Sequence, residues 1–336
     1  MRMARTTLVI GGTRNLGPDL VAALLAHGDR VSVLNRGHTA DDLPGAVERL
    51  RADRSDATAM EGALGSRSYE LVVDTTLYNG RDAESIARLL EGRAGRYVFW
   101  STGQVYLVRT GLTPPFREAD YDGPMTSEPP AEHRVDRENW TYGADKRAAE
   151  DALRSAFAAR AFPYVSLRMP MINSARDHYT RLAGYVHRLL DGGPIVVPDD
   201  QDERRLRHVF GGDVVTATLR SGEPDVPPGA CVNIAQDETL SLEQMLEPVA
   251  RQLDRPLTVR RVPRAVLEER GLLPGCSPWS GRWMSVLAND EAQRVLGLRF
   301  TRVAEYLPPL VEVARTLPAG KVVGLGRRAE EVALAT

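Results

Sequence analysis

The chain has 336 residues, of which 43% are apolar and 26% charged, and its formal net charge is −2. This balance is typical of a globular protein with enough apolar residues for one large domain or two smaller ones. It gives no support to a general nucleic-acid-binding role, which favours a strongly basic surface. No apolar run approaches the roughly 18 residues of a membrane span, and the run before the first glycines is too short for a signal peptide. We therefore expect a cytoplasmic protein with neither a nucleic acid nor a membrane as partner.

Cysteine and lysine are both rare. Cys231 and Cys276 are the only cysteines, and they lack the paired spacing of a disulfide framework or a zinc site, so we expect no metal. Of 43 basic residues, only Lys146 and Lys321 are lysines. An arginine excess is typical of a GC-rich genome, which makes the position of Lys146 more informative.

The first half of the chain alternates short apolar runs with segments of helix or crossover length. Strands are predicted at 6–10, 30–35, 47–53, 69–76 and 96–102, with helices at 16–28 and about 82–91. Runs rich in valine and leucine, separated in this way, indicate a parallel sheet covered on both faces. We predict an α/β fold with a doubly wound parallel Rossmann-type sheet and right-handed crossovers.

The pattern changes after the fifth strand. Residues 107–139 carry five prolines and little periodicity, which is typical of a functional lid or of a disordered segment. A helix is then predicted at 138–157 and a sixth strand at 162–170. Weaker signals predict helices at 181–193, 212–222, 241–254 and 302–316, and a strand at 231–235.

These signals suggest two domains. We expect residues 1–170 to form a dinucleotide-binding Rossmann domain, to which elements from about 194–235 return. Residues 171–316 should form mainly a smaller, partly interleaved substrate-binding lobe. Residues 317–336 are expected to be a C-terminal tail.

The first turn, IGGTRNLG at 10–17, follows a strand and opens a helix, as a dinucleotide fingerprint requires. Gly11 and Gly17 fit the first and last glycine positions, and Arg14 stands where a middle glycine is expected. Glycines let the backbone approach a pyrophosphate, and the helix N-terminus favours its negative charge. An ordinary strand–turn–helix would also explain two glycines. The candidate cofactor contacts here are Gly11, Thr13, Arg14, Asn15, Leu16 and Gly17.

The second strand ends in Asn35 and Arg36, where an NAD site usually places an acid on the ribose 2′-hydroxyl. Arginine can instead bind a 2′-phosphate, and Arg14 could reach the same region. We therefore expect NADP(H) to be preferred, with NAD(H) possible. The alternative is that Arg36 is a solvated loop residue.

The ends of the third and fourth strands supply further candidates for cofactor binding. Asp53 is placed to meet the adenine edge, with Arg54 beside it, although Asp53 could equally cap a helix. Thr75 and Thr76 follow the fourth strand at the same edge.

A catalytic set is predicted from the fifth strand and the helix after it. The strand delivers Thr102 to its carboxyl end, where open α/β sheets place their chemistry. Tyr142 and Lys146 are four residues apart and project from one helix face. An ammonium favours the phenolate form of a nearby tyrosine, which can then act as a general acid or base.

Several segments together resemble one family. YGADK at 142–146 is a YxxxK motif, STGQVY at 101–106 resembles S-[ST]-x-x-V-Y, and the glycine turn and RHVFGGDVV at 207–215 are also similar. These motifs occur in the extended short-chain dehydrogenases/reductases, the NAD(P)-dependent epimerase/dehydratase family. Atypical members, including chloroplast stem-loop RNA-binding proteins, share the arginine in the turn. The resemblance spans roughly residues 6–316.

The resemblance implies roles for particular residues. Tyr142 would be the acid/base, Lys146 its activator and ribose ligand, and Thr102 the hydroxyl partner. LRMP at 167–170 resembles the end of the family's sixth strand, which makes Pro170 a candidate cofactor contact. The family also implies a possible homodimer.

The sequence departs from the family's dehydratases directly after Thr102. Gly103 and Gln104 stand where those enzymes have Asp-Glu, so the 4,6-dehydratase route is disfavoured. Gln104 could contact the substrate or play a structural role. Arg207, with its neighbours at 204 and 205, is a candidate contact for a substrate phosphate, unless this cluster is a solvated charge run.

Two classes of function remain open from the sequence. The first is an enzyme that transfers a hydride at a secondary alcohol or ketone of a sugar or nucleotide-sugar-like substrate. It would act as an epimerase or as a net NADPH-dependent ketoreductase of a secondary metabolite. The second is a non-catalytic NADP-binding sensor or RNA-associated protein.

Overall fold

The computed structural model describes residues 4–334, which divide into two compact units. The first contains Met1–Pro170, Gly211–Ala235 and Leu287–Arg299, and the second contains Met171–Phe210, Gln236–Val286 and Phe300–Thr336. The chain therefore passes between the units several times.

These limits differ from the sequence expectation in three places. Residues 194–210 lie in the second unit, because strand β8 (Ile195–Pro198) pairs with β11 (Val259–Val262) and does not join the large sheet. Residues 287–299 join the first unit, where α10 (Asp290–Leu296) packs against its elements. The expected C-terminal tail is part of the second unit.

The first unit is built on a seven-stranded sheet in the order β10-β6-β5-β4-β1-β2-β3, in which every pairing is parallel. Its strands are β1 (Thr6–Ile10), β2 (Arg30–Asn35), β3 (Glu48–Arg51), β4 (Leu71–Asp74), β5 (Tyr97–Thr102), β6 (Tyr164–Met169) and β10 (Ala230–Asn233). The predicted doubly wound Rossmann-type fold is confirmed. Because all strands are parallel, their carboxyl ends meet at one edge, where such sheets bind ligands.

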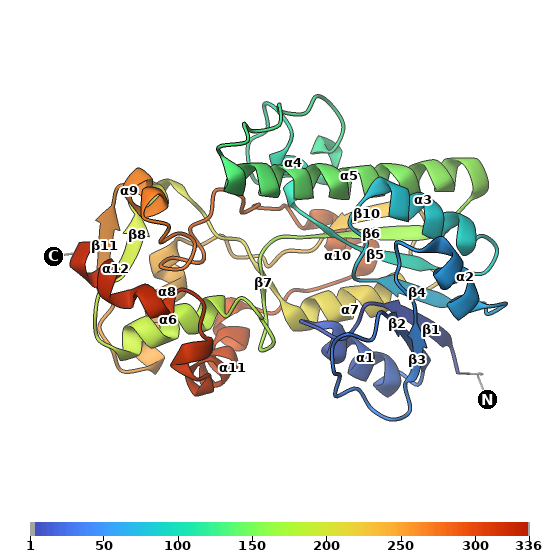
Figure 1. The fold of residues 1–336 in the computed structure, drawn as a ribbon, viewed down its shortest axis with the longest axis horizontal. Coiled ribbons are helices and arrows are strands. Elements are labelled where there is room, and N and C mark those ends of the chain that lie inside the picture. The colour runs from blue at the N-terminus through green and yellow to red at the C-terminus, as the bar shows by residue number, and fades with distance from the viewer. Residues whose placement is uncertain (1–3, 335–336) are drawn as a thin grey trace. The chain divides into compact units, whose positions relative to one another are not determined.

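Helices cover both faces of this sheet (Figure 1). On one face lie α2 (Ala57–Leu64), α3 (Gly80–Leu89) and α5 (Arg134–Arg160). On the other lie α1 (Gly17–Ala26) and α7 (Gly211–Ser221), and α10 packs against α7 and β10. Val72 and Phe99 of the strands, Ile86 of α3 and Leu153 of α5 share one core and are at most 3% exposed.

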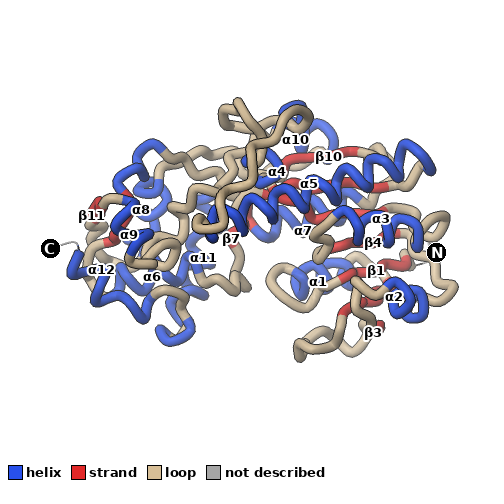
Figure 2. The backbone as a smooth tube through the Cα atoms, turned by 45° about the horizontal axis from the view of Figure 1, so that its top comes forward, coloured by secondary structure: helices blue, strands red, loops and turns tan. Residues whose placement is uncertain are grey.

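The segment predicted to be irregular, 107–139, is part of the first unit. It follows the short helix α4 (Gln104–Leu107) and holds one 3₁₀ turn, η1 (Glu118–Asp120), while α5 already begins at Arg134. Figure 2 shows it mostly as loop. Phe116 and Tyr121 from this segment are buried in a cluster with Tyr106. The segment is therefore anchored by apolar burial.

The second unit is mostly helical around short strands. It contains α6 (Arg181–Leu190), α8 (Leu242–Gln252), α9 (Arg264–Glu269), α11 (Val303–Thr316) and α12 (Arg328–Leu334), the 3₁₀ turns η2 (Asp199–Glu203), η3 (Ala319–Lys321) and η4 (Leu325–Arg327), and a pairing of β7 (Ile172–Asn173) with β9 (Val209–Phe210). Its core includes Tyr185, Trp279 and Tyr306, each at most 2% exposed. Across residues 4–334, no helix combines the length and apolarity that crossing a membrane requires.

Helix α12 is tied to the second unit by a buried ion pair. The Arg188 guanidinium of α6 donates to Glu331 through Nε at 2.9 Å, and the two side chains are 0% and 1% exposed. Arg188 also donates to the backbone oxygens of Gly184 and Gly275. Because Arg188 has no access to water, its charge depends on these partners.

We predict that Glu331→Ala destabilises the protein strongly, because it leaves Arg188 buried without its counter-charge. Breaking one partner of a buried pair costs about 3–5 kcal/mol, measured as a loss of unfolding free energy in urea. The matched control is Glu330→Ala. Glu330 pairs with Arg327 at the surface, and this substitution should leave the unfolding midpoint nearly unchanged. Equal effects of the two substitutions would contradict the prediction.

Candidate active site

The glycine turn after β1 has no room for side chains. Gly11 has φ +97°, and a Cβ on it would lie 2.3 Å from Thr75 Oγ1. A Cβ on Gly17 would lie 2.4 Å from the carbonyl carbon of Gly12, which itself has φ +77°. Gly11 and Gly17 were predicted from the sequence to line a cofactor site, whereas Gly12 was not. All three keep the backbone bare at the carboxyl edge of the sheet.

The N-terminus of α1, which follows this turn, has no side-chain cap. Its N-cap residue, Leu16, is apolar and buried, whereas α2 and α3 are capped by Asp56 and Asn79. The first N–H groups of α1 are thus not bound by a capping side chain. Together with the bare glycines they form a cradle that fits the pyrophosphate of a dinucleotide. Of the other predicted contacts in this turn, Arg14 and Asn15 are exposed and Thr13 is half-buried.

Arginines gather at the end of β2. Arg14 Nη2 donates to Thr39 Oγ1 at 3.0 Å, which places this turn residue against the loop after β2. Arg36 is 63% exposed, and its Nη1 lies 4.0 Å from Asp53 Oδ2. The structure therefore brings Arg14, Arg36 and Asp53 to one edge of the sheet, as the sequence suggested.

A third arginine, Arg51, also lies at the end of β2, and it was not predicted from the sequence. Asn35 Oδ1 accepts from Arg51 Nη1 at 2.5 Å and from the Gly37 backbone N–H at 2.8 Å. A Cβ on Gly37 would lie 2.9 Å from Arg51 Nε. The signal was present in the strand order, because the β2–β3 register pairs Asn35 with Arg51. Asn35 thus holds the Arg51 guanidinium at the end of β2.

Asp53 and Arg54 are neighbours in the sequence, but their side chains have different partners in the structure. Asp53 accepts from the backbone N–H and hydroxyl of Ser55, and these bonds lower the pKa of its carboxyl group. The helix-cap alternative for Asp53 is wrong, because Asp56 caps α2. Arg54 turns inward and donates through both Nη atoms to Asp74, at 2.8 and 3.0 Å.

The Arg54–Asp74 ion pair lies largely buried beside this edge of the sheet. Asp74 is fully buried and also accepts from the Tyr97 hydroxyl at 2.6 Å. Burial alone would raise the pKa of Asp74, but the charge and hydrogen bonds of Arg54 outweigh it, so this pKa is lowered. Arg54 is therefore held mainly by protein groups.

Thr75 and Thr76 connect the carboxyl ends of neighbouring strands. Thr75 Oγ1 donates to the Ile10 carbonyl at 3.0 Å and accepts from the Gly12 N–H at 3.3 Å. Thr76 Oγ1 accepts from Arg54 at 3.2 Å. Thr75 thereby fixes the glycine turn against β4.

Thr102 ends β5, and its surroundings link the strand to α5. Thr102 Oγ1 accepts from the Gln104 N–H at 3.2 Å, and Gln104 Nε2 donates to Asn139 of α5 at 3.2 Å. In the β5–β6 register Thr102 pairs with Met169, so Pro170 follows at the same edge. The amide of Gln104 thus has a structural partner, which is one of the two roles that its sequence position left open.

Tyr142 and Lys146 lie on successive turns of α5 with different exposure. Tyr142 is 36% exposed and Lys146 is 2% exposed. Lys146 Nζ lies 5.9 Å from the centre of the Tyr142 ring and donates to the Trp100 carbonyl of β5 at 2.8 Å. The ammonium therefore sits beneath the tyrosine, against the strand that carries Thr102.

The protonation of Lys146 is strongly perturbed. Burial lowers its pKa from 10.5 to about 7, although Asp74 and Glu150 act in the opposite direction. A lysine perturbed in this way at the carboxyl edge of a Rossmann sheet makes this edge a candidate functional site.

The remaining predicted residue, Arg207, belongs to the second unit. It is half-buried, and its Nε donates to the Gln236 carbonyl at 2.8 Å. Its neighbours at 204 and 205 bond within the same stretch of chain, to Asp200 and to backbone oxygens respectively.

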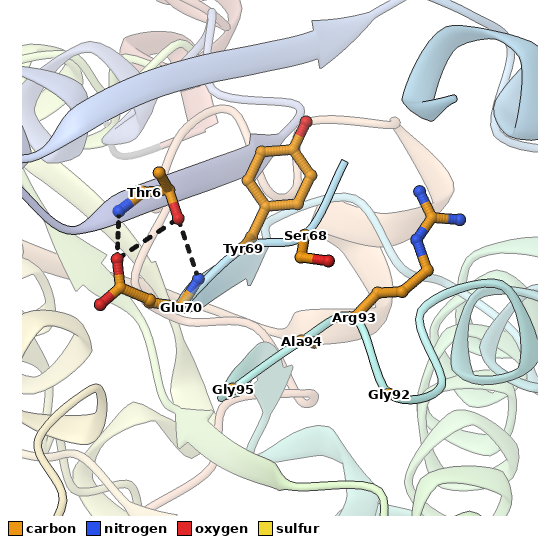
Figure 3. Close-up of a pocket in the computed structure, with 8 residues that line it drawn as sticks. All are labelled: Thr6, Ser68, Tyr69, Glu70, Gly92, Arg93, Ala94 and Gly95. Carbon is orange, nitrogen blue, oxygen red and sulfur yellow. Dashed lines mark hydrogen bonds between the residues drawn. The ribbon is translucent and has the colours of Figure 1, made fainter. Parts of the chain in front are cut away.

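A hollow in the first unit lies away from this edge (Figure 3). It is lined by Thr6, Ser68–Glu70 and Gly92–Gly95, at the amino ends of β1 and β4. There Glu70 accepts from the backbone N–H of Thr6 at 2.8 Å. Since the glycine turn and Thr75 follow the opposite ends of these strands, this hollow is not part of the candidate active site.

Comparison with known proteins identifies the family. Residues 7–235 match the NAD dependent epimerase/dehydratase family. The chain belongs to this family. The resemblance to extended short-chain dehydrogenases/reductases is thus confirmed, and the chain is an NAD(P)-dependent enzyme of this type.

Individual family members are similar along most of the chain. The 2'-dehydrokanamycin reductase of Streptomyces kanamyceticus is 28% identical over 313 residues, which cover 89% of this chain and 84% of that protein. A chloroplast stem-loop binding protein of Arabidopsis thaliana is 27% identical over 228 residues, 63% of this chain and 53% of that protein. A UDP-glucose 4-epimerase of Thermotoga maritima, solved with UDP-glucose, has a TM-score of 0.69 at 20% identity, covering 92% of this chain and 98% of that one.

Gly143, which was not predicted to matter from the sequence, determines how closely α5 packs beside the candidate site. It follows Tyr142 on α5, and a Cβ on it would lie 2.8 Å from the Gln104 carbonyl oxygen and 2.9 Å from Val108 Cγ1. The missing side chain lets α5 approach α4 closely. It thereby sets the distance between Tyr142 and the end of β5.

We predict that Gly143→Ala destabilises the protein by about 1–3 kcal/mol, because the new methyl group overpacks the α4–α5 contact. The measurement is the free energy of unfolding in urea. The control is Gly62→Ala in α2, where a Cβ meets nothing within 4 Å. This control should stabilise the helix by about 0.5–1 kcal/mol. A neutral Gly143→Ala would show that α4 and α5 are not in tight contact.

Proposed function

We propose that this chain transfers a hydride between NADP(H) and a secondary alcohol or ketone carbon of a sugar-like substrate, with Tyr142 as the acid/base. The observation that carries the proposal is the position of Lys146. Its ammonium is buried at the carboxyl edge of the sheet, 5.9 Å from the ring centre of the partly exposed Tyr142. The bare glycine turn lies at the carboxyl edge of the same sheet.

Each residue has a defined task in this proposal. When bound, the nicotinamide supplies or accepts the hydride at its C4 atom. In reduction, Tyr142 donates its phenolic proton to the substrate oxygen, and the Lys146 ammonium stabilises the phenolate that forms. The Thr102 hydroxyl donates a hydrogen bond to the same oxygen. In the oxidative direction the proton moves back to Tyr142.

The residues after Thr102 support redox chemistry at a single carbon over loss of water. Gly103 has no side chain, and the Gln104 amide donates to Asn139. Neither can protonate a leaving hydroxyl or remove a carbon-bound proton. The proposed reaction therefore needs no acid or base beyond Tyr142.

The arginines at the β2 edge support NADP(H) over NAD(H). Arg36 and Arg51 lie beside Asn35, and Arg14 contacts Thr39 from the glycine turn. Guanidinium groups bind a phosphate through charge-assisted hydrogen bonds, whereas Asn35 offers no carboxylate to a ribose diol. NADPH as cofactor favours net reduction, and so does the similarity to a reductase along most of the chain.

The substrate class rests on the family and on the second unit. We propose that the second unit binds a sugar or nucleotide-sugar-like ketone and that Arg207 contacts its phosphate where one is present. One similar protein is a 2'-dehydrokanamycin reductase and another is a UDP-glucose 4-epimerase, so ketones of both kinds serve as probes. A homodimer is part of the proposal by family analogy.

We predict that Tyr142→Phe lowers kcat by about 10²- to 10⁴-fold, the usual contribution of a general acid or base. NADPH affinity should be retained, because the phenolic oxygen acts on the substrate. The assay is NADPH oxidation with 2′-dehydrokanamycin and a UDP-4-keto-sugar as ketone probes. The control is Tyr69→Phe, which removes a buried hydroxyl at the amino end of the strands.

Lys146→Arg sharpens this test. It keeps a positive charge, but the guanidinium is broad and must fit among rings whose centres lie 4.7–5.9 Å from Nζ. We expect most of the activity to be lost. Unchanged turnover in Tyr142→Phe would overturn the proposed role of Tyr142.

We predict that Arg36→Ser raises the Kd for NADPH by about 10- to 100-fold, the value of a hydrogen bond to a charged group, and leaves the Kd for NADH nearly unchanged. Binding is measured by nicotinamide fluorescence. The control is Arg88→Ser, which removes an arginine of similar exposure from the last turn of α3. Mass spectrometry of any nucleotide retained by the purified protein gives a second test. Tightly held NAD⁺ would contradict the NADP preference and favour epimerisation.

A further inference from the structure

Three aromatic rings enclose the ammonium group of Lys146. Its Nζ lies 4.7 Å from the centre of the Phe99 ring, 4.9 Å from that of Tyr78 and 5.9 Å from that of Tyr142. All three distances are within the range of cation–π attraction. Phe99 is fully buried on β5, Tyr142 belongs to α5 and Tyr78 follows β4. The enclosure thus draws on three separate elements.

Tyr78 is the outer wall of this enclosure. It is 50% exposed, whereas Lys146 behind it is 2% exposed. Its ring centre lies 6.4 Å from that of Tyr142, with the two planes tilted by 52°. Tyr78 and Tyr142 therefore stand side by side between the ammonium and solvent. Sequence reasoning gave Tyr78 no role.

The backbone around Tyr78 is held against α5. Asn79, the next residue, caps α3 by accepting from the Asp82 N–H at 2.9 Å. A Cβ on Gly80 would lie 3.0 Å from the Ala148 carbonyl oxygen of α5. The start of α3 is thus pressed onto α5 one turn or less from Lys146. This contact between α3 and α5 fixes the backbone next to Tyr78.

The charges around Lys146 come from several elements. Asp74 of β4 and Glu150 of α5 favour the ammonium, while Arg54 from the loop after β3 opposes it. Asp74 is already paired with Arg54, and Glu150 with Arg168 of β6. The ammonium donates a hydrogen bond to the Trp100 carbonyl. Ring faces therefore supply much of its local stabilisation.

We propose that Tyr78 is a positioning residue for the reaction, because its ring closes the open side of the enclosure and holds the Lys146 ammonium beside Tyr142. The face of the ring is the part that acts, and the hydroxyl group is dispensable for it. The catalytic consequence rests on the proposed function, whereas the effect on Lys146 does not.

The two lysines of the chain make a direct measurement simple. In a sample labelled only at lysine, NMR gives one signal from buried Lys146 and one from exposed Lys321. Tyr78→Leu keeps an apolar side chain over the ammonium but removes the ring face. We expect the pKa of Lys146 to fall by about one unit in this variant. Tyr78→Phe keeps the ring and should leave this pKa unchanged.

Lys321 is the internal control, and its signal should be the same in all samples. Since Tyr78 is half exposed, both variants are expected to fold, which an unchanged Lys321 signal and circular dichroism spectrum verify. Equal pKa values of Lys146 in the Tyr78→Leu and Tyr78→Phe proteins would overturn the proposal. So would a higher pKa in Tyr78→Leu, because it would mean that Tyr78 only excludes water.

The kinetic readout separates positioning from substrate binding. With the same ketone probes and NADPH, Tyr78→Leu should lower kcat at pH 7 by about fivefold, because a pKa that falls by one unit from about 7 reduces the ammonium fraction from about one half to about one tenth. KM should remain unchanged, and the alkaline limb of the pH–kcat profile should move to lower pH by the same amount as the Lys146 titration. A shifted titration with an unchanged kcat would overturn the catalytic role. If the wild-type protein were inactive, the proposed function would fail, while the NMR result would still decide the role of Tyr78 toward Lys146.

Discussion

Helix α5 rests on the sheet through buried charges, and the candidate active site depends on this contact. Lys146, Arg147 and Glu150 are 2%, 6% and 2% exposed, although they lie within three turns of one helix. Burying charges is costly unless each finds a partner. Here Glu150 accepts from Arg168 of β6, and Arg147 donates to the Val105 and Tyr121 carbonyls. These bonds fix the position of α5 on β5 and β6, and they thereby fix the position of Tyr142.

The sheet could be predicted from the sequence, but the way in which α5 packs on the sheet could not. Runs such as TTLVI and RYVFWST carry enough valine, leucine and aromatic residues to indicate buried parallel strands. In contrast, KRAAE at 146–150 has the composition of a solvated helix face. Its burial is decided by partners that are remote in sequence, such as Arg168 and the Tyr121 carbonyl of the segment 107–139. A periodicity argument has no access to such partners.

At the candidate cofactor site, too, some residues could be predicted from the sequence and others could not. The glycine turn and Arg36 could be located because they directly follow strands. Arg51 could not, since its guanidinium is presented by Asn35 across a strand pairing and over the bare backbone of Gly37. The importance of Gly143 could not be predicted for a similar reason. The need for a glycine at this position of α5 follows only from its close contact with α4. Local motifs predict which side chains are available, and tertiary contacts decide which of them meet.

The burial of Lys146 also explains why this position differs from the chain's many arginines. A guanidinium carries five N–H groups and keeps its charge at any ordinary pH, so it requires several acceptors when buried. The enclosure offers the Trp100 carbonyl and three ring faces. Those partners suit a compact ammonium whose pKa burial has lowered to about 7. A lysine with such a pKa can change its charge near neutral pH, and arginine cannot.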